Sequence, residues 1–352
     1  MTNRASLRAE QIGFTLIELM ITIVISLLIS GATYMVYVSS RHSFQFSEAS
    51  ARNQEAVRYS LDTMTYDLRH AGHVGCNAGT NPGGPLGASK LAILVNSADA
   101  WAKYSDAIRG YSASNLPAGV FTASEVAAGT DVLWVQYFSS KYWPLTNAGA
   151  PKSGTFQVVG NMTDFANTNI MAVTDCSGGD MFVATDVIAP ASNNSAATIG
   201  HASGTYNTTG NLSRDYGKDA ELLRFVTRIY FIGTSNGLPV LKRKNLTNMG
   251  LTDEEIADGI SDMQIRYGID KNADGYADQY LLANDIAATE WPLVVAAQIC
   301  LQYVGTDDKL TEKSSAGKYQ RYYNCAGNQI DATDRKFRQA ANTASTFRNR
   351  VQ

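Results

Sequence analysis

The sequence lacks the features by which most enzymes, zinc proteins and general nucleic-acid binders are recognised. Its four cysteines form no CxxC pair, which excludes the usual spacing of a zinc site or a thioredoxin-like redox site. No P-loop and no GxGxxG motif occurs. The formal net charge is -3 and the basic residues are scattered, so the basic excess of a general nucleic-acid binder is missing. We therefore expect no nucleic acid among the partners.

One apparent catalytic pattern fails on its context. Residues 233–237 match GxSxG, the pattern of a nucleophile elbow, and they follow a predicted strand. An elbow must lead into a helix and needs a later histidine, but Pro239 follows almost at once and His201 is the last histidine in the chain. We interpret the segment as a turn between strands, and we expect no catalytic residues and no enzyme.

The four cysteines indicate paired structural disulfides, which require an oxidising compartment. Four cysteines allow three pairings, and the sequence alone does not choose among them. We predict Cys300 with Cys325, closing the polar loop between them, and Cys76 with Cys176, tying the exit of a long helix to a sheet. The part of the chain that carries them should then lie in the periplasm or outside the cell.

The N-terminus carries the strongest signal. Residues 14–38 form an apolar run long enough to cross a bilayer as a helix, with Glu18 as its one formal charge. A carboxylate in hydrocarbon is costly without a partner. The preceding residues 1–13 are polar and basic, and they lack the apolar core and cleavage site of a secretory signal. If a peptidase cuts after Gly13, Phe14 becomes a new N-terminus, and Glu18 can pair with its own or a neighbour's α-amino group.

The succession Gly13-Phe14-Thr15-Leu16-Ile17-Glu18 resembles the class III signal of type IV pilins and pseudopilins. The resemblance implies that Gly13 is the residue that the prepilin peptidase requires and that Phe14 is the N-methylated first residue. It also implies that Glu18 helps to dock the subunit into the growing filament. The alternative is an ordinary signal anchor with a stray glutamate.

Past the membrane segment the pattern becomes amphipathic. Val57, Leu61, Met64 and Leu68 recur at steps of four, three and four, so the sequence predicts that the helix continues to about residue 70. Glycine, asparagine, serine and proline then accumulate through residue 90 and end it. Short β-branched or aromatic segments follow, which we predict as strands, at 131–138, 155–159, 181–188, 221–232, 238–242, 261–269 and 292–304. Residues 190–213 have no periodicity and are predicted as an exposed loop.

These elements predict an α+β fold, a pilin-like long N-terminal helix packed on a mostly antiparallel β-sheet head. The predicted domains are a leader at 1–13, a transmembrane and amphipathic helix at 14–72, and a β-rich periplasmic or extracellular head at 73–352. The chain resembles the PilW-type minor pilins in a series of further segments: 174–177, 238–243, 259–268, 270–278 and 347–350.

Residues 270–278 also fit a calcium loop. Asp270, Asn272, Asp274 and Asp278 stand at loop positions one, three, five and nine, and Gly275 stands at position six. The usual glutamate at position twelve is absent, because Leu281 stands there. The alternative is a hairpin turn whose carboxylates cap backbone amides. Calcium is the one candidate cofactor, and these four residues are its candidate ligands.

The resemblance implies a minor pilin that helps to initiate type IV pilus assembly and sits in a tip complex. Its expected partners are other minor pilins, the major pilin, the prepilin peptidase, the inner-membrane assembly platform and a large tip adhesin. It should cross the inner membrane once, with its head in the periplasm, and later lie at the pilus tip on the cell surface. The alternatives are a minor pseudopilin of type II secretion, and a ligand-binding pilus adhesin or DNA-uptake subunit.

Overall fold

The computed structural model describes residues 13–75, 91–146, 148–159, 165–188, 196–305, 308, 311, 313, 314 and 317–350. The chain forms two compact units, Met1–Arg52 and Asn53–Gln352. One helix, α1 (Leu16–His70), belongs to both, because its second half is part of the larger unit. The predicted helix is therefore confirmed as a single element.

The first part of α1 has the composition of a membrane span. It is long and apolar enough to cross a bilayer, with a mean hydropathy of 2.2 over its most apolar window, and no residue of that window is buried. Thr15 stands at the N-terminal boundary of the helix, and Glu18 lies in its first turn. An apolar surface of this extent requires hydrocarbon or other apolar helices around it.

The second half of α1 is amphipathic, as its spacing predicts. Val57, Met64 and Leu68 are buried and Leu61 is half-buried, so all four face the head. The opposite face is polar, and Glu55, Arg58, Asp62 and Arg69 on it are exposed. Burial of the apolar stripe fixes this part of the helix on the head, because each fully buried aliphatic side chain contributes about 1.5 to 3 kcal/mol.

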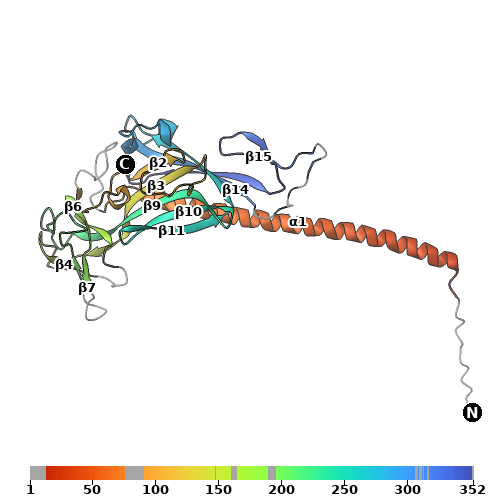
Figure 1. Ribbon diagram of the computed structural model, residues 1–352, viewed down its shortest axis with the longest axis horizontal. Helices are drawn as coiled ribbons and strands as arrows, with labels where there is room; N and C mark the ends of the chain where they lie inside the picture. Colours follow the sequence, from red (N-terminus) through yellow and green to blue (C-terminus); the bar gives the residue numbers. More distant parts are fainter. Residues whose placement is uncertain are drawn as a thin grey trace, which may run out of the picture. The chain divides into compact units, whose positions relative to one another are not determined.

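The largest sheet of the head has eight strands. The hydrogen-bonded order is β1-β6-β5-β9-β10-β11, while β3 pairs with β9 and β2 pairs with β3 (Figure 1). All neighbours are antiparallel except β1 and β6. The strands are β1 (Leu91–Ile93), β2 (Ile108–Ser112), β3 (Asp131–Pro144), β5 (Ile170–Asp175), β6 (Gly178–Val183), β9 (Glu221–Ser235), β10 (Leu238–Thr247) and β11 (Gly250–Asp258).

A second, wholly antiparallel sheet has four strands in the order β13-β12-β14-β17. These are β12 (Ile260–Ile269), β13 (Gln279–Leu282), β14 (Val294–Val304) and β17 (Arg338–Thr346). Two smaller sheets are formed by β4 (Thr155–Val158), β8 (Ala197–Gly200) and β7 (Asp186–Ile188), and by β15 (Arg321–Tyr323) and β16 (Gln329–Asp331). Single 3-10 turns lie at Ala100–Ala102, Ala283–Asp285 and Trp291–Leu293.

The main core lies between these parts. The buried stripe of α1 packs with apolar residues of β3, β9, β10, β12 and β14, so the helix and both large sheets share one hydrophobic cluster. Tyr267 of β12 belongs to this cluster and is fully buried. Gly110 of β2 is required beside it, because a Cβ at this position would come within 2.4 Å of the Tyr267 hydroxyl oxygen. The α+β fold predicted from the sequence is confirmed.

Two sequence predictions are wrong in detail. The segment 181–188 is two strands of different sheets, since β6 ends at Val183 and β7 begins at Asp186. Residues 197–200, predicted as loop, form the central strand β8 of the three-stranded sheet. In contrast, the GxSxG segment is a hairpin turn, as predicted: Asn236 and Gly237 between β9 and β10 both have positive φ, 52° and 77°, which suits a two-residue hairpin loop.

Asp131 links the two large sheets. It begins β3, and its Oδ2 accepts a hydrogen bond of 2.8 Å from the backbone N–H of Ile265 on β12. Burial, aided by the nearby charge of Asp262, raises the pKa of Asp131 to about 6, although the Ile265 bond opposes this shift. The folded protein therefore holds the proton more tightly than the unfolded chain does.

This carboxyl predicts a pH dependence of stability. As the pH rises from the unfolded pKa near 3.8 through about 6, the contribution of Asp131 to the free energy of unfolding should fall. The reason is that the folded protein must release a proton that it binds more tightly than the unfolded chain does. Asp131→Asn keeps an acceptor for Ile265 and should raise the free energy of unfolding at pH 7.5 by about 1 to 2 kcal/mol, a range reduced for solvent screening of a half-buried group. Urea unfolding at pH 4 and 7.5 tests this, with the exposed Asp285→Asn as control. Equal stability of Asp131→Asn and the parent chain at pH 7.5 would contradict it.

Candidate functional site

The predicted processing site lies at the start of α1. Phe14 is 84% exposed, and a Cβ added at Gly13 would meet no atom within 4 Å. The backbone N–H of Glu18 donates to Thr15 Oγ1 at 3.3 Å, and Thr15 Oγ1 lies 3.5 Å from Glu18 Oε2. This is one half of a capping box, in which the threonine side chain accepts the N–H of the residue three positions later. The Thr15 side chain thus caps the first turn of α1, where the Glu18 carboxylate lies near the positive end of the helix dipole. The docking role of Glu18 stays a prediction.

A buried polar cluster joins the second half of α1 to the eight-stranded sheet. Asp67 is 2% exposed, and its two carboxylate oxygens accept hydrogen bonds from Tyr137 on β3 at 2.7 Å and Tyr230 on β9 at 2.5 Å. Arg243 on β10 lies 3.5 Å from Asp67 Oδ2 and also donates to the Tyr230 hydroxyl at 3.1 Å. Its other Nη donates to Glu254 on β11 at 2.8 Å. Because α1 and four strands contribute, the cluster fixes the position of this part of α1 on the head.

The tyrosines of this cluster are held protonated. Burial is the largest cause, and the charge of Asp67 adds to it, so the pKa of both Tyr137 and Tyr230 lies well above the ordinary value. Each hydroxyl therefore stays a donor toward Asp67 across the physiological pH range. No local pattern in the sequence indicates this cluster, because its members are far apart in the chain.

The C-terminal residues of the chain strengthen the same joint at the last turn of α1. Phe347 is fully buried, and its N–H donates to Val295 O at 2.8 Å. Asn349 Nδ2 lies within 3.2 to 3.4 Å of the carbonyl oxygens of Arg69 and His70, the last two of α1, and of Ala71, which follows it. Such carbonyls have no partner inside a helix and need an external donor. Arg350 is buried and donates to Trp291 O and Val294 O. The segment 347–350 therefore ties the end of α1 to the four-stranded sheet.

The disulfide prediction is confirmed where the structure describes it. Cys300 and Cys325 are bonded, which fixes the excursion between β14 and β17 on the outer face of the four-stranded sheet. A loop of this length gives about 3 kcal/mol in the chain-entropy model. Cys176 is also disulfide-bonded, and Cys76, its predicted partner, lies outside the described residues.

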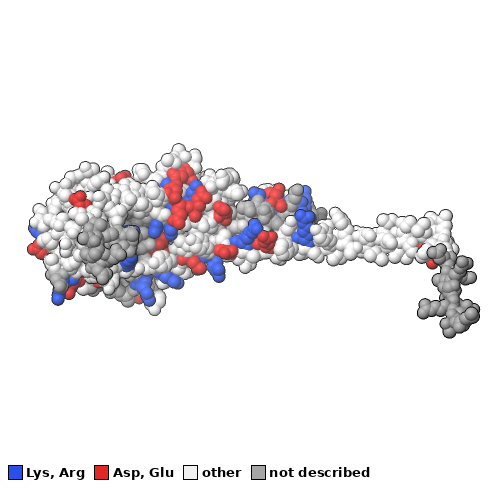
Figure 2. All heavy atoms as spheres, turned by 90° about the horizontal axis from the view of Figure 1, so that it is seen from below, with Lys and Arg blue, Asp and Glu red and all other residues white. Residues whose placement is uncertain are grey.

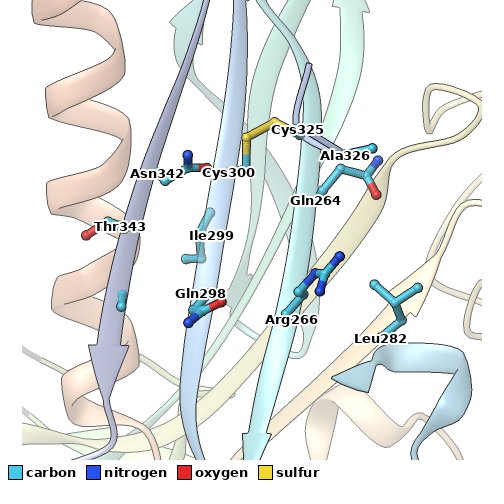
Figure 3. A pocket seen from close by; sticks show the side chains of 11 residues that line it. Gln264, Arg266, Leu282, Gln298, Ile299, Cys300, Cys325, Ala326, Asn342 and Thr343 are labelled. Carbon is cyan, nitrogen blue, oxygen red and sulfur yellow. A yellow bond between two sulfur atoms is a disulfide. The ribbon is translucent and has the colours of Figure 1, made fainter. Parts of the chain in front are cut away.

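A groove of about 600 Å³ opens beside this disulfide. Its lining comes from all four strands of the sheet and mixes polar with apolar groups. The polar residues are Gln264, Arg266, Gln298, Asn342 and Thr343. Figure 3 shows α1 alongside β17, with Thr343 on the side of β17 that faces the helix. A second groove, of about 310 Å³, lies between α1 and β17.

Acidic and basic residues are interspersed on the face of the molecule in Figure 2. The same mixing is ordered on β10 and β11, where Lys242, Arg243 and Lys244 stand directly opposite acidic residues of the neighbouring strand. Such pairing neutralises the basic side chains locally, so the residues of these two strands provide no continuous basic surface.

The candidate calcium loop lies between β12 and β13. Asp270 accepts backbone N–H groups from Ala273 at 2.7 Å and Gly275 at 2.8 Å, and Asp278 accepts that of Lys271 at 2.7 Å. Asp274 accepts the N–H of Tyr276, and Asn272 Nδ2 lies within 3.3 Å of both Asp274 and Asp278. The structure therefore brings the four candidate ligands together in one turn. Within the part of the chain that it describes, no group of three His, Cys, Asp or Glu residues is arranged to hold a metal ion.

Calcium binding stays a prediction, because calcium loops also use amide and backbone oxygens. Calorimetric titration of calcium into the full chain in detergent should give a heat of binding that Asp274→Ala removes. The matched control is Asp285→Ala, an exposed position outside the loop. If the parent chain gives no heat, the carboxylates act only as caps of the turn.

Comparison with known proteins finds two family models at opposite ends of the chain. Residues 8–34 match the prokaryotic N-terminal methylation motif, and residues 229–349 match the type IV pilus-assembly protein W family. The second match begins in β9 and contains the calcium-loop candidate, the whole four-stranded sheet and residues 347–349 of the C-terminal tie. Neither a curated protein nor a solved structure is significantly similar to the chain.

Proposed function

This chain is a type IV pilin-like protein of the PilW type, and from that premise we propose that it is a minor pilin that helps to initiate pilus assembly. In this role it sits in a tip complex with other minor pilins. The observation that carries the proposal is the combination of a prepilin-type N-terminus and a PilW-type head in one chain. The first supplies entry into a filament, and the second supplies contacts specific to one position in it.

The proposed route begins in the inner membrane. The prepilin peptidase cleaves after Gly13, Phe14 is methylated, and the apolar part of α1 holds the subunit with its head in the periplasm. The assembly platform then brings it together with other minor pilins and the major pilin. The prepilin-type motif and the exposed apolar helix support this route, since both fit a membrane-anchored pilin. A large tip adhesin is the remaining proposed partner.

The head acts in this proposal as a structural module and not as an enzyme. Pilin-family domains are structural, and the GxSxG segment of this chain is a hairpin between β9 and β10. The rigid joint at Asp67 and the tie at 347–350 support a head that keeps a fixed orientation on the second half of its helix.

A deletion strain tests the proposal. We expect surface pili in sheared fractions to be lost while secreted enzymes in the same culture stay at normal levels. Complementation with the parent gene should restore pili, and complementation with the Gly13→Val variant should not. Normal pili with enzymes trapped in the periplasm would instead assign the protein to type II secretion.

A further inference from the structure

One edge of the four-stranded sheet presents open backbone groups. β17 pairs with β14 along its whole length, residue by residue, without a bulge. Among the described strands none is hydrogen-bonded to its other side, although β15 lies close to its first residues. Phe347 N–H donates to Val295 O, and Gly305 N–H donates to Phe337 O. Hydrogen-bonded pairs alternate in an antiparallel ladder, so the odd-numbered residues of β17 bond to β14. The even-numbered residues, 338 to 346, direct their N–H and C=O groups outward.

The chain itself satisfies the first of these outward pairs. The side chain of Gln320 accepts the N–H of Arg338 at 2.7 Å and donates to its C=O at 2.8 Å. A glutamine amide here imitates the backbone of an adjacent strand. In the described part of the chain, no such bond reaches the outward groups of Ala340, Asn342, Ala344 and Thr346. The open edge is therefore four donor–acceptor pairs long.

The other long edge strand is protected in the ways usual for sheet edges. β11 carries Asp253, Glu254, Glu255 and Asp258, and its pairing with β10 contains a register shift. Charges and bulges on an edge prevent other strands from pairing with it. From residue 339 to 346, β17 has no charged residue, no proline and no bulge. The edge of β17 therefore lacks the features that prevent another strand from pairing with it.

The groove between α1 and β17 shows what kind of strand fits. Val57 and Leu61 on the helix and Ala341 on the strand form an apolar part of its lining, while Arg58, Asp62 and Asn342 are polar. An extended chain has side chains that alternate between two faces. An occupant of this edge would place apolar side chains toward Val57 and Leu61 and polar ones toward the outer face of the sheet. Seven residues, 340 to 346, correspond to roughly 23 Å of extended chain.

We propose that an extended segment of another pilin subunit adds to β17 as a fifth strand of this sheet. The segment alternates apolar and polar residues and bonds to the outward groups of residues 340, 342, 344 and 346. Strand addition of this kind draws affinity from main-chain hydrogen bonds and specificity from alternate side chains. This inference rests on the proposed function, because it requires a companion subunit.

Residue-resolved hydrogen exchange tests the proposal on the full chain in detergent, alone and co-purified with its companion minor pilins. In the isolated chain, the amides of Ala340, Asn342, Ala344 and Thr346 should exchange rapidly. In the complex, they should exchange at least tenfold more slowly, whereas the inward amides of Ala341 and Thr343 should be protected in both samples. Ala344→Pro removes one outward N–H and leaves the bonds to β14, since proline is tolerated on a sheet edge. It should weaken the complex at least tenfold, and Ala344→Ser should not.

The outcomes separate this inference from the proposed function. A complex that forms without slower exchange at these four amides, and that tolerates Ala344→Pro, overturns strand addition and leaves the minor-pilin role intact. Protection that appears in the isolated chain as its concentration rises means that a second copy occupies the edge, which overturns the proposed occupant. Failure of the parent chain to bind any companion minor pilin overturns the function and this inference together.

Discussion

Replacing Asp67 by alanine should lower the free energy of unfolding of the head by about 3 kcal/mol. The side chain is buried at the joint between α1 and the eight-stranded sheet, where it accepts hydrogen bonds from Tyr137 and Tyr230 and faces Arg243. Its removal leaves the buried hydroxyl groups of Tyr137 and Tyr230 without their acceptor. The nearly buried guanidinium of Arg243 also loses one of its two carboxylates and keeps only Glu254. Urea unfolding of the full chain in detergent, followed by tryptophan fluorescence, measures the change.

Two further variants separate this effect from a general weakening of the helix. Asp67→Asn keeps one acceptor oxygen and should cost about 1 to 2 kcal/mol. Asp62→Ala changes the same residue type on the exposed face of the same helix and should stay within about 0.5 kcal/mol of the parent chain. An Asp67→Ala chain as stable as Asp62→Ala would show that the cluster contributes nothing to the joint.

Replacing Gly13 by valine should abolish processing, with no mature protein formed. A Cβ at this position meets no atom within 4 Å, so the fold does not resist the change, and any loss reports on the peptidase. Intact-mass spectrometry of the membrane fraction should find the parent chain beginning at a methylated Phe14 and the variant retaining all of residues 1–13.

Gly31→Ala is the matched control, because it also adds a methyl group in open space on α1 and should be processed normally. A mature mass from the Gly13→Val chain would remove Gly13 from the processing site. An uncleaved Gly31→Ala chain would show instead that the assay responds to any change in the apolar segment.

The long helix was predictable because its signals are local. An uninterrupted apolar run and the spacing of Val57, Leu61, Met64 and Leu68 depend on neighbours along the chain, and they identify both the span and the face that packs on the head. The pairing of Cys300 with Cys325 was also predicted correctly, since the intervening segment is a polar excursion between two strands.

The joint and the smaller strands could not be predicted, because their partners are distant. Asp67 is an ordinary polar residue of a helix until β3, β9 and β10 bring Tyr137, Tyr230 and Arg243 to it. β8 lies within a stretch of small polar residues, and it is a strand because β4 and β7 pair with it on either side. Tertiary pairing overrides weak local propensity in such segments. The residues at 347–350 matched a family pattern, but their role as a tie for α1 follows from the contacts of Asn349 and Arg350.

The disulfide between Cys300 and Cys325 also sets how far the protein lengthens when it is pulled. The bonded residues are 25 positions apart. When the chain is stretched from its two ends, the force passes through the disulfide and not through the residues between the two cysteines. At about 3.3 to 3.6 Å per residue, the oxidised chain is roughly 80 to 90 Å shorter at full extension than the reduced one. The residues within this closed loop, including those of β15, carry no load until the bond is reduced.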